Sequence, residues 1–146
     1  MVLCDSNVWL ALTLSKHVHH DAARGWLDSI DTPASVCFCR ATRQTLLRLL
    51  NSATVLGPYG NPPLTNRQAW KAYAAFLADD RIAFRGEEPP ALEAHWERFA
   101  KRDTASPKLW MDSYLAAFAV AGGYRMVTID GANRQFRGLD LHLIDP

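Results

Sequence analysis

Long apolar runs are missing from this 146-residue sequence, and no apolar stretch approaches the roughly 20 residues that a membrane-spanning helix needs. The first residues also lack the basic segment, apolar stretch and cleavage site of a secretory signal peptide. Cysteine is scarce: Cys4, Cys37 and Cys39 contain no Cys-x-x-Cys pair, so neither a disulfide framework nor a cysteine zinc site is indicated. We therefore expect a cytoplasmic protein that has no membrane segment.

Net charge is also nearly absent, because sixteen Lys and Arg residues face fifteen Asp and Glu residues, for a formal charge of +1. A general attraction to nucleic acid or to an anionic membrane is therefore not expected. The charges are unevenly placed, since residues 32–78 contain five cations and no acid, and the remainder carries −4. This imbalance indicates a cationic surface beside an acidic site, or it arises by chance.

The length predicts one domain covering residues 1–146. Short apolar runs alternate with segments of helical periodicity, which predicts an α/β fold with a parallel sheet and helices on both faces. The expected strands are Val2–Cys4, Ser35–Cys39, Ile82–Phe84, Met126–Ile129 and a final edge strand over Leu139–Leu143. Residues 51–64, rich in Gly and Pro, are expected to form a loop, and a capping box at Thr65 and Gln68 begins the next helix.

Three aspartates stand where such a sheet gathers functional groups. Asp5 directly follows the first strand and Asp130 follows Met126–Ile129, so both should lie at the carboxyl edge if these strands are neighbours. Asp112 is the only acid in the apolar segment Leu109–Val120, where a buried carboxylate costs several kcal/mol unless it is paired or binds a metal. Because carboxylates suit Mg²⁺ and Mn²⁺, the three together predict a divalent metal site.

Each aspartate also has a structural explanation that the sequence leaves open. Asp5 could cap the helix that follows it, and Asp130 with the next glycine is a common turn dipeptide. Asp112 could be exposed or could pair with Lys108. The histidines His17, His19 and His20 lack cysteine partners at zinc-site spacing, and we expect them at the solvated start of a helix.

Taken in order, these segments resemble a PIN-domain ribonuclease, specifically a VapC-type toxin of a bacterial type II toxin–antitoxin system. The resemblance rests on the segments Asp5–Leu12, His17–His20, Phe38–Thr42, Leu46–Leu50, Ser106–Ala119 and Val127–Asp130. It implies a three-layer α/β/α sandwich, Mg²⁺ or Mn²⁺ as cofactor, and metal-dependent endonucleolytic cleavage of RNA. It also implies a homodimer that is neutralised by a small VapB-type antitoxin and that reaches promoter DNA only through that antitoxin.

The resemblance also assigns residues to the site. By position, Asp5, Asp112 and Asp130 correspond to the family's acidic residues and would be both catalytic and metal-binding. Asn7 and Thr128 match polar positions beside them, where we expect hydrogen bonds that orient the carboxylates. Ordinary polarity at a helix start and a strand end would explain the same two residues.

One departure concerns the start of the third helix, where family members commonly place a glutamate. This chain has Arg43 nearest to the equivalent position, followed by Gln44. A cation there would weaken metal binding by repulsion or would contact the scissile phosphate, and Gln44 could act through a water molecule.

Two classes of function follow from these observations. The three aspartates favour a metal-dependent endoribonuclease toxin. The missing glutamate favours a catalytically weak PIN fold that acts mainly as an antitoxin-binding regulatory module. A small phosphohydrolase is disfavoured, because the chain has neither a phosphoaspartate motif nor a Gly-rich phosphate loop. The basic side chains that could contact RNA phosphates are Arg40, Arg48, Lys71 and Lys108.

Overall fold

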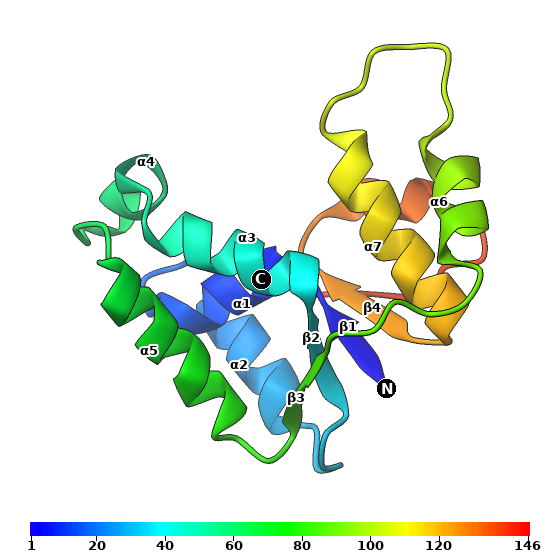
Figure 1. Ribbon diagram of the computed structural model, residues 1–146. Helices are drawn as coiled ribbons and strands as arrows, with labels where there is room; N and C mark the ends of the chain where they lie inside the picture. The colour runs from blue at the N-terminus through cyan, green and yellow to red at the C-terminus, as the bar shows by residue number, and fades with distance from the viewer.

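A five-stranded sheet forms the centre of the computed structural model, which describes residues 1–146 (Figure 1). Its strand order is β3-β2-β1-β4-β5, and all four neighbouring pairs are parallel. The strands are β1 (Val2–Cys4), β2 (Val36–Cys39), β3 (Ile82–Arg85), β4 (Arg125–Thr128) and β5 (Leu141–Leu143). The predicted parallel sheet with an edge strand at its C-terminal end is confirmed.

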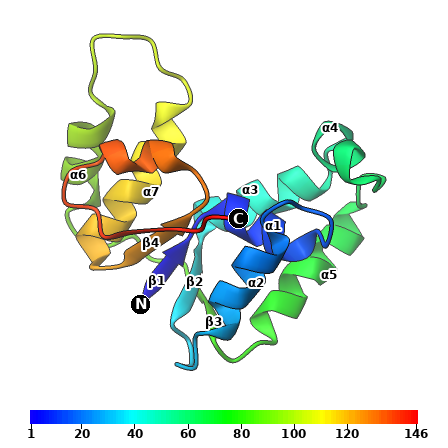
Figure 2. The same ribbon diagram turned by 180° about the vertical axis from the view of Figure 1, so that it is seen from behind.

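Helices cover both faces of this sheet, as Figures 1 and 2 show from opposite sides. The α-helices are α1 (Ser6–Thr13), α2 (His20–Asp28), α3 (Arg40–Leu50), α4 (Ala53–Leu56), α5 (Asn66–Leu77), α6 (Leu92–Ala100) and α7 (Leu109–Gly122). Two short 3₁₀ helices are η1 (Gly57–Tyr59) and η2 (Gly131–Gln135). The three-layer α/β/α architecture is confirmed. No helix is long and apolar enough to cross a membrane.

Alternate side chains of the strands enter two separate cores. On β1, Leu3 packs with Phe118 in the core beneath α6 and α7, whereas Cys4 packs with Trp9 in the core beneath α1, α2, α3 and α5. Both sheet faces are therefore buried, which explains why the central strands are continuously apolar in sequence. Within the second of these cores, the rings of Trp9 and Phe38 stack with their centroids 3.8 Å apart.

Local sequence signals set several helix ends. The predicted capping box is present, because Thr65 Oγ1 accepts from Gln68 N at 3.2 Å and Gln68 Oε1 accepts from Thr65 N at 2.9 Å. Gly123 ends α7 in the left-handed conformation, with φ of 70°. The loop predicted over residues 51–64 is wrong in part: α4 and η1 lie there, and Ser52 caps α4 by accepting from Val55 N at 3.3 Å.

The topology brings distant segments to one edge of the sheet. β1 and β4 are hydrogen-bonded neighbours with Cys4 opposite Val127, so the residues that follow them, Asp5 and Thr128, lie side by side. Asp5 N donates to Val127 O at 2.9 Å. The helix α7 precedes β4 and runs back along the sheet, which places its N-terminal turn, with Asp112, at the same carboxyl edge.

Candidate metal and catalytic site

Asp5 is a buried carboxylate, with 7% of its surface exposed. It is the N-cap residue of α1, as one explanation expected, but its side chain makes no capping hydrogen bond, so capping does not explain the carboxylate. Instead, Oδ2 accepts from Thr128 Oγ1 at 2.8 Å and Oδ1 accepts from Ser6 Oγ at 3.3 Å. Burial raises the pKa of Asp5, and the hydrogen bond from Thr128 opposes that rise.

Thr128 is the centre of a hydrogen-bond network at the end of β4, and it is fully buried. Its hydroxyl donates to Asp5 and accepts from Asn7 Nδ2 at 3.0 Å and from Asp130 N at 3.1 Å. Asn7 Oδ1 in turn accepts from Ile129 N at 3.3 Å. One hydroxyl therefore fixes the positions of Asp5, Asn7 and the backbone of Asp130 relative to one another.

Asp130 is exposed and caps η2, since its Oδ1 accepts from Ala132 N at 2.9 Å. The expectation that Asp130 forms a turn with the next glycine is therefore correct, and the turn uses Oδ1. A hairpin does not follow, because β5 pairs with β4 in the parallel direction. The second oxygen, Oδ2, makes no hydrogen bond within the protein, and it remains available to a ligand.

Asp112 is half-buried in the first turn of α7, and its carboxylate makes no hydrogen bond or ion pair. Pairing with Lys108 is therefore not observed. Burial raises the pKa of Asp112, and the charges of Asp5 and Asp130 raise it further, while the charge of Lys108 opposes them. Asp112 is thus close enough to Asp5 and Asp130 to be repelled by both charges, and it makes no ion pair of its own.

A divalent ion fits this donor set only if it keeps several of its water ligands. No group of three or more His, Cys, Asp or Glu side chains lies close enough together to enclose a metal ion. Mg²⁺, however, usually keeps several water ligands and is held through one or two carboxylates. Separated oxygen donors, among which Asp112 is repelled by the charges of Asp5 and Asp130, fit such a hydrated Mg²⁺ or Mn²⁺ ion, and they do not fit a site in which the protein supplies every ligand.

Arg43 lies away from these carboxylates. Its guanidinium carbon is 4.1 Å from the ring centroid of Phe84 and 5.8 Å from that of Tyr73. It is also not among the charges that shift the pKa of Asp112. The structure therefore does not bring Arg43 to the site, although the sequence places it nearest to the position of the family's glutamate.

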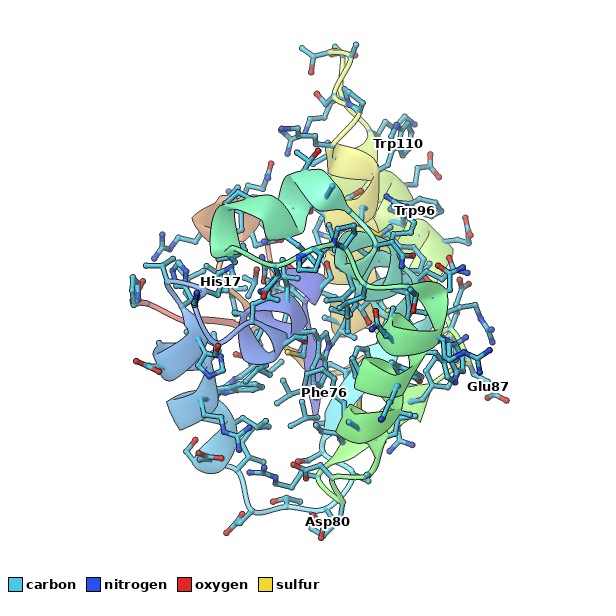
Figure 3. All side chains as sticks on the ribbon, turned by 90° about the vertical axis from the view of Figure 1, so that its left-hand side faces the viewer. His17, Phe76, Asp80, Glu87, Trp96 and Trp110 are labelled. Carbon is cyan, nitrogen blue, oxygen red and sulfur yellow. The ribbon has the colours of Figure 1, made fainter.

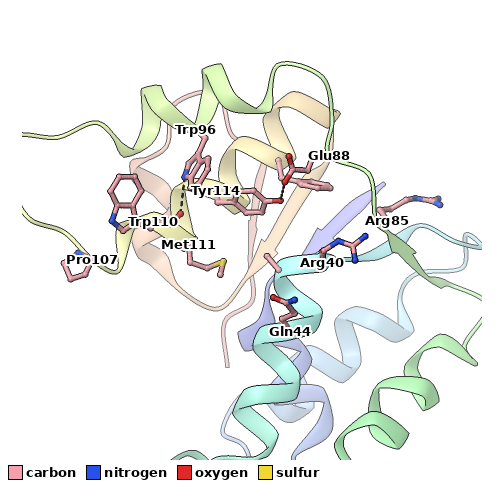
Figure 4. A pocket seen from close by; sticks show the side chains of 12 residues that line it. Arg40, Gln44, Arg85, Glu88, Trp96, Pro107, Trp110, Met111 and Tyr114 are labelled. Carbon is pink, nitrogen blue, oxygen red and sulfur yellow. Dashed lines mark hydrogen bonds between the residues drawn. The ribbon is translucent and has the colours of Figure 1, made fainter. Parts of the chain in front are cut away.

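Gln44 faces a different feature, an open pocket of about 500 Å³ between α3 and α7 (Figure 4). At its rim, Trp110 and Met111 are 61% and 41% exposed, and they directly precede Asp112 on α7. Tyr114 Oη donates to Glu88 Oε1 at 2.9 Å on the far wall. The pocket is lined by Arg40, Ala41, Gln44, Arg85, Gly86, Glu88, Trp96, Pro107, Trp110, Met111, Tyr114 and Phe118.

The histidines of the α1–α2 connection lie on the helical layer that carries α1 and α2, and Figure 3 labels His17 there, well separated from Trp96 and Trp110. His17 stacks on Tyr59 with centroids 5.2 Å apart. His20 Nδ1 lies 2.8 Å from Ala11 O, within donating distance. These rings pack the loop against α1 and η1.

Sequence reasoning missed Asn133, which is 1% exposed and belongs to the same network. Its Nδ2 donates to Asp130 O at 3.1 Å and lies 3.5 Å from Thr128 Oγ1, while its Oδ1 is buried without a partner. The available signal was its spacing from Asp130, because residues three apart stack on one side of a 3₁₀ helix. That signal requires η2 to be recognised first, and a five-residue 3₁₀ helix has no clear sequence pattern.

A family model described as PIN domain matches residues 2–139. Over 144 residues, 99% of each chain, the sequence is 61% identical to a protein named Ribonuclease VapC41 from Mycobacterium tuberculosis (strain ATCC 25618 / H37Rv). It is also 27% identical to Ribonuclease VapC29 of the same strain over 137 residues, which are 94% of this chain and 91% of the relative.

Solved structures share the fold at lower identity. The structure of Mycobacterium tuberculosis VapC20, described as a Sarcin-Ricin loop cleaving toxin, superposes with a TM-score of 0.67 at 18% identity and covers 96% of this chain and 98% of its own. VapBC2 from Rickettsia felis, bound to a DNA fragment from their promoter, gives 0.69 at 13% identity and covers 99% and 100%.

Proposed function

Because this chain belongs to the PIN-domain family, and within it to the VapC ribonuclease toxins, we propose that it hydrolyses RNA phosphodiester bonds with a divalent metal ion held by Asp5, Asp112 and Asp130. The observation that carries the proposal is the meeting of three carboxylates at one sheet edge, where Asp112 makes no ion pair or hydrogen bond. Repulsion among them is relieved when a divalent cation binds. Mg²⁺ and Mn²⁺ are the ions that this oxygen-only donor set suits.

The chain's own residues prepare the site before any ion binds. Thr128 holds Asp5 Oδ2 and the backbone N of Asp130 through one hydroxyl, so the Asp5 carboxylate and the backbone of Asp130 keep a fixed relative position. Asn7 accepts from the backbone after β4 and donates to Thr128, which fixes the rotamer of that hydroxyl. Such partners orient metal ligands and strengthen their binding. A bound divalent ion supplies polarisation of the phosphate and acidification of a water molecule for attack on phosphorus.

The competing function, a catalytically weak regulatory module, was suggested by a cation in place of the family's glutamate. The Arg43 guanidinium lies over the ring of Phe84, and Arg43 is not among the charges that shift the pKa of Asp112, so we expect little repulsion between Arg43 and a metal ion. This placement supports a catalytic role for the aspartates. Gln44 stands at the neighbouring pocket, and we assign it contact with the substrate rather than with the ion.

The proposed partners are an RNA substrate, a VapB-type antitoxin and a second copy of the chain. Support for the antitoxin comes from similar folds solved as VapBC assemblies, including VapBC-1 from nontypeable Haemophilus influenzae, which has a TM-score of 0.62 and 15% identity and covers 98% of each chain. Promoter DNA would be contacted through the antitoxin. A homodimer is proposed from the resemblance to VapC-type toxins, which implies one.

Purified protein incubated with total RNA tests the proposed chemistry. We expect fragments to form with Mg²⁺ or Mn²⁺, to disappear with excess EDTA, and to return when the divalent ion is restored, because carboxylates alone supply no strong activation of water. Electrophoresis of the RNA with time is the measurement. Cleavage that continues at the same rate in excess EDTA would contradict the proposal. Absence of RNA cleavage, together with normal growth when the chain is expressed without the antitoxin, would favour the regulatory module.

A further inference from the structure

Two segments far apart in sequence form a cationic surface that the charge pattern along the chain does not reveal. Residues 98–102 and 134–137 contain five cations among nine residues and no acid. All five are exposed: Arg98, Lys101, Arg102, Arg134 and Arg137. We call these five residues the α6–η2 basic surface. It lies outside residues 32–78, the stretch in which sequence alone indicated a cationic face.

Contacts between α6 and η2 fix this surface in place. The rings of Phe99 and Phe136 pack with centroids 5.2 Å apart, and the Arg102 guanidinium donates to Gln135 Oε1. Between the segments lies a hollow of about 190 Å³. Four of its seven lining residues are cations and none is an acid: Arg98, Phe99, Lys101, Arg102, Gln135, Phe136 and Arg137.

Little within the protein compensates these charges. Lys101 pairs with Glu97 at 3.2 Å, but both side chains are largely exposed, where such pairs contribute little. Arg98 lies 4.5 Å above the ring of Phe99 and contacts His95, which leaves its charge unpaired. Arg137 makes no ion pair with an acid. The surface therefore presents concentrated positive charge on a chain whose formal charge is only +1.

The helix η2 links the α6–η2 basic surface to the carboxylate edge, by which we mean the sheet edge with Asp5, Asp112 and Asp130. Asp130 caps the first turn of η2, and Arg134 stands near its end, roughly 8 Å further along at the rise of a 3₁₀ helix. The Arg134 guanidinium folds back toward that first turn, since a side chain at Gly131 would lie 3.0 Å from its Nη1. Cations thus continue from the hollow to the residue beside the proposed metal site.

We infer that the α6–η2 basic surface binds the phosphate backbone of the RNA on one side of the scissile bond, an inference that rests on the proposed ribonuclease function. A row of exposed cations that ends at a carboxylate edge matches a polyanion whose next phosphate is the one attacked. Backbone contacts of this kind supply affinity without reading sequence. An acidic protein segment could also pair with these cations. Its binding, however, would not require that the cations extend toward the carboxylates.

Fluorescence anisotropy with a labelled 20-nucleotide single-stranded RNA of mixed sequence tests the inference, in EDTA and at several salt concentrations. The variant replaces Arg98, Arg102 and Arg137 with Gln. Each lost phosphate contact lowers the slope of log K against log[salt] by about 0.7, so we expect a decrease of about 2 and roughly tenfold or weaker binding at low salt. Replacing the same three residues with Lys should keep the slope, since charge is retained.

The matched control replaces Arg48, Arg67 and Lys71 with Gln, three exposed cations of the acid-free stretch. A slope that is unchanged in the first variant but lower in this control would overturn the inference. Retained RNA binding with loss of binding to a labelled polyglutamate peptide would also overturn it, in favour of an acidic protein partner. Wild-type cleavage of total RNA with Mn²⁺ reports separately on the proposed function, so the two failures are distinguishable.

Discussion

We expect replacement of Asp112 with Asn to remove most of the RNA cleavage while the protein stays folded. Asn has the same shape but no charge, so it weakens metal binding at the site, and we expect the rate to fall about a hundredfold or more, since a metal ion contributes several kcal/mol to such reactions. The folded state loses no hydrogen bond or ion pair, because the Asp112 carboxylate makes none. Removal of its repulsion with Asp5 and Asp130 leaves the melting temperature unchanged or slightly higher.

The matched control for this variant is Asp31→Asn, which removes one exposed carboxylate from the connection after α2. Cleavage rates of both variants are compared with Mn²⁺ at one protein concentration, and circular dichroism melts report folding. Equal loss of activity in the two variants would point to a general effect of charge. Wild-type activity in Asp112→Asn would remove Asp112 from the mechanism.

We expect Thr128→Val to lower both stability and activity, because one buried hydroxyl bonds three groups. Val keeps the shape of the side chain but leaves Asp5 Oδ2, Asn7 Nδ2 and Asp130 N without their shared partner. Unpaired buried polar groups of this kind cost about 1–3 kcal/mol each, and we expect a total loss of about 2–4 kcal/mol after local relaxation. Loss of a residue that orients metal ligands also lowers metal affinity about 10- to 100-fold.

Urea denaturation measures the stability loss, and Thr128→Ser is the control because it keeps the hydroxyl. We expect Thr128→Ser to retain most of both the stability and the activity, since serine can make the same three hydrogen bonds. If Thr128→Val keeps full metal affinity while it loses stability, the hydroxyl supports only the fold. If Thr128→Val and Thr128→Ser have equal stability and equal activity, the Thr128 hydroxyl has no specific role at this sheet edge.

The architecture could be predicted because each local signal agreed with the global pattern. Continuous apolar runs such as Val36–Cys39 are typical of strands in a parallel sheet that is covered on both faces, and Val36–Cys39 is buried throughout. The pairing of β1 with β4 was assumed when Asp5 and Asp130 were placed at one edge, and the structure shows that pairing. The short helices α4 and η1 could not be predicted, because Gly57 and Pro58 are typical of a loop and are equally compatible with a single turn of 3₁₀ helix.

The site could be predicted less completely, since side-chain direction depends on packing. Nothing in the sequence says that Arg43 turns toward the ring of Phe84, because that ring comes from a strand about forty residues away in sequence. The basic surface was missed for the same reason: Arg102 and Arg137 come together only when η2 packs on α6. Charge counts along a chain detect cationic surfaces only when one continuous segment forms them.

Titration of the metal-free protein with Mn²⁺ at neutral pH, followed by the electron paramagnetic resonance signal of free Mn²⁺, tests most directly whether these aspartates hold a divalent ion. We expect saturable binding to the wild-type chain, at least tenfold weaker binding to Asp112→Asn, and unchanged binding to Asp31→Asn. Equal Mn²⁺ affinity in the wild type and in Asp112→Asn, or no saturable binding by either, would contradict it.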